Sequence, residues 1–147
     1  MKQFFTFYFP PILWSSFIFI ASSNSDPLGP LPESAIPAMK ATRILGVRLD
    51  NLIWALSHIF IYAVLSFLVA RALNQHRYFN AQFFQLVFAL SLLYGISDEI
   101  HQHFVPGRGF QLYDILMDGL GALLGLGLYA ALQHKRAQKK RQQALLL

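Results

Sequence analysis

The chain has 147 residues, of which only 13% are charged while 55% are apolar and 15% are aromatic. A soluble domain carries about 25% charged residues, so this deficit argues against a soluble fold and indicates a lipid environment. The net charge of +5 does not point to nucleic acid, because the basic C-terminal run is short and lacks interleaved aromatic residues. The absence of cysteine excludes disulfides, thiolate metal sites and a cysteine nucleophile.

Four mainly apolar runs have about the 20-residue length that a helix needs to cross a hydrocarbon core of about 30 Å. In chain order they are residues 4–21, 52–70, 79–97 and 115–132. None alternates strictly between apolar and polar residues, as a barrel strand would. The sequence therefore predicts an all-α bundle of four transmembrane helices, forming a single membrane domain over residues 1–147.

The first run contains the pair Pro10-Pro11, which predicts a kink or a delayed start of regular helix. A cleaved signal peptide is the alternative interpretation, because Lys2 precedes an apolar run that ends in small residues at Ala21. The run is long and aromatic for a signal core, which favours a retained span.

The connection from residue 22 to residue 50 is expected to begin irregularly, because it holds four prolines: Pro27, Pro30, Pro32 and Pro37. Its second part, residues 38–52, interleaves apolar and basic side chains. This pattern predicts a short helix in the membrane interface.

Basic residues in the loops predict the orientation, because lysine and arginine are retained on the cytoplasmic side. With both termini inside, the cytoplasmic set comprises Lys2, Arg71, Arg77, Lys135, Arg136, Lys139, Lys140 and Arg141. The outer set is smaller and comprises Lys40, Arg43, Arg48 and Arg108. We therefore predict a multi-pass protein of the cytoplasmic membrane, with residues 133–147 as a basic cytoplasmic tail and residues 97–114 on the outer side.

The segment SDEIHQHFVPGRGFQLYD, residues 97–114, concentrates polar side chains in an otherwise apolar chain. On a helix continuing out of the third run, Asp98, His101 and Gln102 share one face, while Glu99 and His103 share another. The following VPGRG breaks the helix, since proline cannot continue it and the glycines allow a tight reversal. Arg108 is therefore expected to turn back toward the same end of the bundle.

The fourth run places Asp114, Asp118, Gly121 and Gly125 on one side of a helix, at spacings of four, three and four residues. The two glycines form a GxxxG pattern, which lets a neighbouring helix approach closely and turns the carboxylates into the bundle. His58 lies roughly 12 Å below the outer end of the second run. An ionisable group at that depth usually faces a partner or a water cavity.

These polar residues allow three interpretations. They can be structural, because side chains near helix ends snorkel and interhelical hydrogen bonds hold bundles together. They can form a binding site for an envelope molecule, with Arg108 holding an anion. They can also perform acid–base or metal-assisted chemistry on a lipid-linked cell-wall precursor. The candidate catalytic residues are Asp98, Glu99 and His101, and the candidate ligand-binding residues are His58, Gln102, Arg108, Asp114 and Asp118.

No metal or cofactor is assigned from the sequence. Spacings such as HExxH are absent, so the ligands of a metal would have to come from several helices. The expected partners are the lipid bilayer and, at the polar site, a lipid-linked wall precursor or a glycopeptide antibiotic. The oligomeric state is left open.

The stretch DEIHQHFVPGRGFQLYDILMDGLGALLG, residues 98–125, resembles the signature of the VanZ-like family of small membrane proteins. The shared features are an acidic pair, His-Gln, an aromatic residue, Pro-Gly-Arg, and an aspartate that opens a glycine-bearing last helix. More loosely, Trp14 with residues 22–25 resembles the end of the family's first span, and residues 58–65 resemble its second span. The resemblance therefore touches all four runs and is most specific in the last third.

The resemblance implies a role in the bacterial envelope, because the family's namesake is associated with resistance to teicoplanin-type glycopeptide antibiotics. It carries over onto Asp98, Glu99, His101, Gln102, Arg108, Asp114 and His58 in this chain. Two departures change the charge of the site. Asp118 stands where the family usually has asparagine, and Trp54 and Ala55 stand where a lysine is often found.

Overall fold

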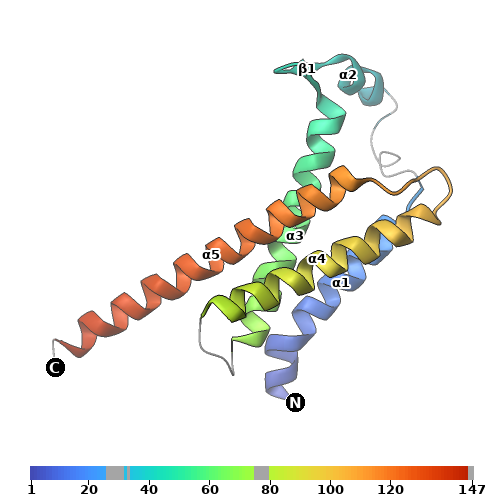
Figure 1. Ribbon diagram of the computed structural model, residues 1–147. Coiled ribbons are helices and arrows are strands. Elements are labelled where there is room, and N and C mark those ends of the chain that lie inside the picture. Colours follow the sequence, from blue (N-terminus) through green and yellow to red (C-terminus); the bar gives the residue numbers. More distant parts are fainter. Residues whose placement is uncertain (26–31, 33, 75–79, 146–147) are drawn as a thin grey trace.

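The computed structural model describes residues 1–25, 32, 34–74 and 80–145 of the chain. Four helical spans within these residues are long and apolar enough to cross a membrane (Figure 1). The first consists of η1 (Phe4–Tyr8) and α1 (Phe9–Ser22), and the others are α3 (Leu49–Leu73), α4 (Ala81–His103) and α5 (Leu112–Ala144). The predicted all-α architecture with four spans is therefore confirmed.

The helices extend beyond the apolar runs that predicted them. Helix α4 continues past Ser97 to His103, and α5 continues to Ala144. The predicted basic tail is therefore largely an exposed extension of α5. As a consequence, the polar residues at the end of the third run lie on a regular helix, which fixes their directions.

The proline pair in the first span delays the start of the α-helix, as predicted. Residues Phe4–Tyr8 form a turn of π-helix, and α1 begins at Phe9 with Pro10 and Pro11 in its first turn. Proline has no N–H to donate to the preceding turn, so the regular pattern of hydrogen bonds starts only after the pair.

The predicted interfacial helix over residues 38–52 is wrong. The structure has a short helix, α2 (Ala35–Ala41), followed by the two-residue strands β1 (Arg43–Ile44) and β2 (Val47–Arg48), which pair antiparallel. Leu45 and Gly46 both have positive φ, at 50° and 84°. This is the backbone that a tight hairpin turn requires, so the chain reverses at a position where a helix would have had to continue. The prolines at 27 and 30 lie outside the described residues.

The most extensive helix contact joins α3 and α5, which cross closely (Figure 1). A Cβ atom built on Gly121 would overlap the backbone of Ile59, and one built on Gly125 would overlap the carbonyl of Ala63. Ser66 Oγ donates to the backbone oxygen of Ala122 at 2.9 Å across this contact. The GxxxG pattern therefore acts as predicted and brings the two backbones together.

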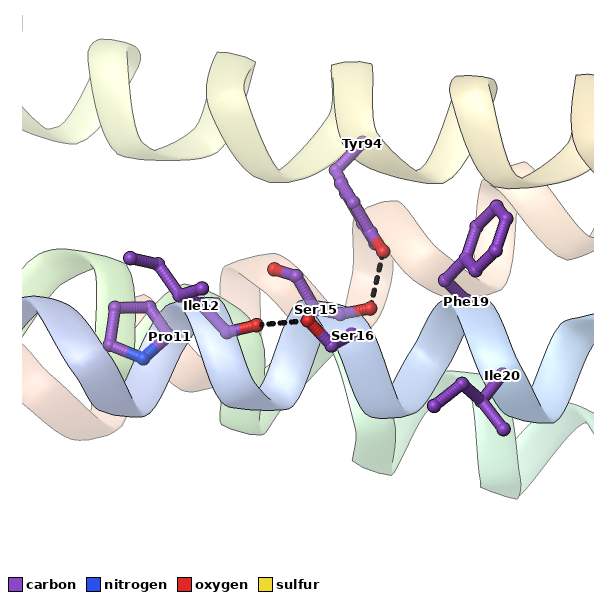
Figure 2. Close-up of a pocket in the computed structure, with 7 residues that line it drawn as sticks. All are labelled: Pro11, Ile12, Ser15, Ser16, Phe19, Ile20 and Tyr94. Carbon is purple, nitrogen blue, oxygen red and sulfur yellow. Dashed lines mark hydrogen bonds between the residues drawn. The ribbon is translucent and has the colours of Figure 1, made fainter.

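Two hydrogen bonds from side chains to backbone carbonyls join helix α1 to its neighbours. Trp14 Nε1 donates to the carbonyl of Ile61 on α3 at 2.9 Å. Tyr94 reaches down from α4, and its hydroxyl donates to the carbonyl of Ser15 at 2.5 Å (Figure 2). The groove around Tyr94 has mostly apolar walls, including Ile12 and Phe19. Its lining contains no acidic, basic or histidine side chain, so the ionisable candidate residues lie elsewhere in the bundle.

The buried apolar residues leave one end of the bundle to polar side chains. One apolar cluster lies toward the end of α3 and the start of α4 and comprises Ala70, Phe83, Val87, Leu126 and Tyr129. A second lies midway and comprises Ile18, Tyr62 and Leu65. Beyond it, α1 and α4 end where α3 and α5 begin (Figure 1). The candidate site residues occupy this end.

Candidate functional site

Four carboxylates are buried where α1 and α4 end and α3 and α5 begin. Asp98 is 6% exposed, Asp118 1%, and Glu99 and Asp114 are fully buried. Burying an unpaired carboxylate is costly, so each of these groups requires a partner or a proton. The surroundings of each carboxylate therefore show what the site can do.

Asp98 joins α4 to α1. Its Oδ1 accepts a hydrogen bond from Ser22 Oγ at 2.5 Å, and its Oδ2 accepts one from Gln102 Nε2 at 3.0 Å. Gln102 in turn accepts from the guanidinium of Arg108 through its side-chain oxygen. These four polar residues thus form a chain of hydrogen bonds from Ser22 on α1 to Arg108 in the turn that follows α4.

The turn after α4 brings Arg108 back over the bundle, as predicted. Gly107 takes a φ of +79°, and the N–H of Arg108 bonds the carbonyl of Val105 at 3.1 Å. The guanidinium lies 4.7 Å above the ring of Trp54 and donates to the carbonyl of Asn24 at 3.4 Å. Its partners among the described residues are thus an aromatic face, an amide and a carbonyl.

His58 faces two aspartates of α5, in agreement with the expectation that a deep ionisable group has a partner. Its Nδ1 lies 2.8 Å from Asp118 Oδ1, and its Nε2 lies 3.8 Å from Asp114 Oδ2. Asp118 is among the most deeply buried of these groups, and its carboxylate touches Gly95, where any Cβ would meet Asp118 Oδ2 at 2.8 Å. Helices α3, α4 and α5 therefore meet around this pair.

Glu99 completes the group. Its Oε2 accepts a hydrogen bond from the backbone N–H of Gln111 at 2.9 Å, while Asp114 Oδ2 accepts one from Trp54 Nε1 at 3.2 Å. One ligand-type atom from each of His58, Glu99 and Asp114 lies within 4.8 Å of the other two. Side chains from three helices are thus assembled into one compact cluster.

The two faces predicted for the end of the third helix meet different neighbours, and both are partly buried. Glu99 is buried like Asp98 and Gln102, whereas His103 is exposed. The reason is that α4 contacts both α1 and α5, so Asp98 points to one neighbour and Glu99, about 100° further round, points to the other.

His101 lies apart from the buried cluster. It is only partly buried, stacks on Phe19 with ring centroids 4.3 Å apart, and its Nε2 lies 2.9 Å from Ser23 Oγ. The other candidate residues, His58, Asp98, Glu99, Gln102, Arg108, Asp114 and Asp118, gather at the same end of the bundle. A direct role beside Glu99 is therefore not supported for His101 by its contacts.

A cavity of about 130 Å³ opens between the helices at this end. Its walls combine apolar side chains such as Ile61 with the polar groups of His58, Asp98 and Arg108. This volume is below the ~300–1,000 Å³ of a typical drug-sized pocket, so the cavity cannot enclose a drug-sized molecule.

Contacts made by three residues at this end of the bundle were not expected from the sequence. Ser22 bonds Asp98, Trp54 supports both Arg108 and Asp114, and the backbone of Gln111 holds Glu99. Trp54 carried a signal, because a tryptophan near the polar end of an apolar run has an N–H that needs an acceptor. Nothing in the sequence pointed to Ser22 or Gln111, since serine is common at helix ends and the contact of Gln111 uses only its backbone.

Comparison with models of protein families shows which family the chain belongs to. The model of the VanZ/LLP1 family matches residues 5–133. The chain belongs to the VanZ/LLP1 family. The match spans α1, α3 and α4 and takes in the whole polar cluster, whereas the basic end of α5 lies beyond it.

No curated protein and no solved structure gives a significant match to the chain. The family membership therefore rests on the VanZ/LLP1 model, and it agrees with the resemblance of residues 98–125. It establishes a VanZ-family protein with four membrane-spanning helices.

Proposed function

We propose that this VanZ/LLP1 protein works in the bacterial envelope by binding the polar end of an amphiphilic envelope molecule at the outer leaflet. The observation that carries the proposal is the cavity between α1, α3 and α4. Its lining combines apolar side chains, among them Ile18 and Ile61, with the side chain of Arg108. A lipid-like molecule with a phosphate or carboxylate head matches this combination, since arginine binds such groups in bidentate fashion.

The size of the cavity bears on glycopeptide resistance, the theme of the family's namesake. A volume of about 130 Å³ cannot enclose a whole glycopeptide antibiotic. We therefore propose that protection against teicoplanin-type compounds arises through an envelope lipid or lipid-linked wall precursor that the protein binds, rather than through capture of the entire drug.

A susceptible host expressing the wild-type protein is expected to tolerate at least a few-fold more teicoplanin, and Arg108→Ala is expected to abolish this gain. The reason is that Arg108 supplies the cavity's guanidinium, whose loss removes a charge-assisted contact worth about 1.5–3 kcal/mol. The measurement is growth inhibition by teicoplanin and by vancomycin at matched membrane levels of each protein.

Arg43→Ala is the matched control, because Arg43 is exposed on the hairpin at the same end of the protein. It should protect as well as the wild type. Equal protection by wild type and Arg108→Ala would contradict the proposed binding role. Lack of protection by every variant would contradict the link to glycopeptides.

Chemistry on a lipid-linked wall precursor is the second candidate, favoured by the His58–Asp118 pair. A carboxylate bound to the Nδ1 of a histidine is the usual arrangement for an imidazole that transfers protons through Nε2. Lipid profiling of the same strains separates the two candidates: an enzyme changes the chemical structure of a wall lipid, whereas a binding protein changes none. If the protein is purely structural, each variant would lower only the amount of folded protein in the membrane.

The proposed orientation places the hairpin outside and both termini in the cytoplasm. The chain has no cysteine, so single cysteines can be introduced at exposed positions of the hairpin and of α5. In intact cells, a membrane-impermeant maleimide is expected to label Leu45→Cys. Gln143→Cys should be labelled only after lysis. The reverse pattern would overturn the orientation and place the polar site on the cytoplasmic side.

A further inference from the structure

Three buried side chains from three different helices converge on one point. His58 comes from α3, Glu99 from α4 and Asp114 from α5, and one ligand-type atom of each lies within 4.8 Å of the others. Glu99 and Asp114 have no exposed surface, and His58 is 8% exposed. We propose that these three side chains hold a divalent transition-metal ion.

Each of the three side chains is held by one atom and offers another. His58 uses Nδ1 toward Asp118, Glu99 uses Oε2 toward the backbone of Gln111, and Asp114 uses Oδ2 toward Trp54. Among the described residues, the second oxygens, Glu99 Oε1 and Asp114 Oδ1, are buried without a hydrogen-bond partner. Buried acceptors without donors are rare, so these oxygens point to a ligand that carries positive charge.

The contact between His58 and Asp118 has the form of a support for a metal ligand. Metal-binding histidines usually donate their other ring N–H to a carboxylate, which fixes the tautomer and the direction of the free nitrogen. In the tautomer that carries its proton on Nδ1, Asp118 accepts that proton at 2.8 Å and the lone pair of Nε2 lies 3.8 Å from Asp114 Oδ2. In that tautomer two acceptors face each other, and either a proton or a cation between them removes the repulsion; a metal ion is the cation that we propose.

The ligand types select the metal. One imidazole and two carboxylates suit Zn²⁺ or Mn²⁺, whereas Mg²⁺ and Ca²⁺ prefer oxygen alone. Metal–ligand bonds of about 2.0–2.2 Å require the three atoms to draw together by roughly 1 Å, which side-chain rotation supplies. His58 also lines the cavity of about 130 Å³, so a further coordination position would face it. Three protein ligands with an open position are typical of a zinc ion that meets a ligand or substrate.

The test is metal binding by the full-length protein in detergent after treatment with a chelator, followed by calorimetric titration with Zn²⁺ and Mn²⁺. We expect about one ion per chain, and at least a tenfold loss of affinity in Glu99→Gln and in Asp114→Asn. Asp118→Asn is expected to weaken binding about 10–100-fold through the orientation of His58.

Surface histidines supply the control. His103 and His134 are exposed, so the double variant His103→Gln/His134→Gln should bind the ion as the wild type does. The absence of a bound ion, or a loss of binding in this double variant with none in Glu99→Gln, would overturn the proposal.

X-ray absorption of zinc bound to the wild-type chain gives a second readout that does not depend on whether buried variants fold. One imidazole nitrogen with oxygen ligands supports the site. Two or more imidazoles would assign the ion to surface histidines and overturn the proposal. The result is independent of the envelope ligand, because the metal can bind whether or not the cavity accepts a lipid.

Discussion

Replacing Gly125 with alanine is expected to remove most of the folded protein from the membrane. A Cβ at this position would overlap the carbonyl of Ala63 and the hydroxyl of Ser66 on α3. The carbonyl belongs to a helix backbone and cannot turn aside, so α3 and α5 would have to separate. Overpacking usually costs ~1–3 kcal/mol, and a backbone clash lies at the upper end of that range.

Gly127→Ala is the matched control for this prediction. Gly127 lies two residues further along α5, and a Cβ there meets nothing within 4 Å. Because alanine favours a helix over glycine by about 1 kcal/mol, this variant should be as stable as the wild type or more so. Thermal unfolding in detergent, monitored by size-exclusion chromatography, measures the melting temperature of each variant. Equal melting temperatures for Gly125→Ala and Gly127→Ala would show that the close crossing of α3 and α5 does not stabilise the bundle.

The close approach at Gly121 and Gly125 was predictable, because the glycine face that permits it is set by the residue spacing within one helix. A spacing of four residues places Gly121 and Gly125 on the same face, whatever lies opposite, and the same reasoning correctly grouped Asp114 with Asp118. The lengths of the apolar runs likewise predicted the spans, since the bilayer sets the length of a helix. What a single periodic segment determines could therefore be inferred from the sequence.

The arrangement of different helices could not be inferred in this way. Nothing in the spacing shows that His58 faces Asp118 across α3 and α5, or that Glu99 points to a second neighbour of α4. The prediction of an interfacial helix was wrong for a related reason, because the amphipathic pattern over residues 38–52 is common to a helix and a hairpin. The structure has the hairpin, with a positive φ at Leu45 in its turn. Distances between the candidate residues required the structure.

The buried pair of His58 and Asp118 is expected to be the most sensitive polar contact of the bundle. Asp118→Ala removes the acceptor from the Nδ1 of a histidine that is only 8% exposed. Breaking a buried pair by deleting one member costs ~3–5 kcal/mol in soluble proteins, while hydrogen bonds between membrane helices average about 0.6 kcal/mol. Because Asp118 is in addition packed against Gly95, we expect a loss of about 3 kcal/mol.

Two further variants separate the charge of Asp118 from its shape. Asp118→Asn keeps an oxygen to accept from His58 and nearly the same volume, so it should cost about 1 kcal/mol. Asp50→Ala removes the carboxylate of an ion pair with the more exposed Arg48 at the start of α3, and it should cost much less than Asp118→Ala. Unfolding free energies in mixed detergent micelles should rank Asp118→Ala well below both.

A double-mutant cycle with His58→Phe tests whether the loss belongs to the pair. If the two side chains stabilise each other, the double variant His58→Phe/Asp118→Ala is less damaged than the sum of the single changes, by about 0.5–3 kcal/mol. Additive losses would mean that each residue is held by its helix and by Gly95 or Trp54 rather than by its partner. The coupling therefore decides whether the pair is a joint that unites α3 with α5, in addition to any role in holding an ion.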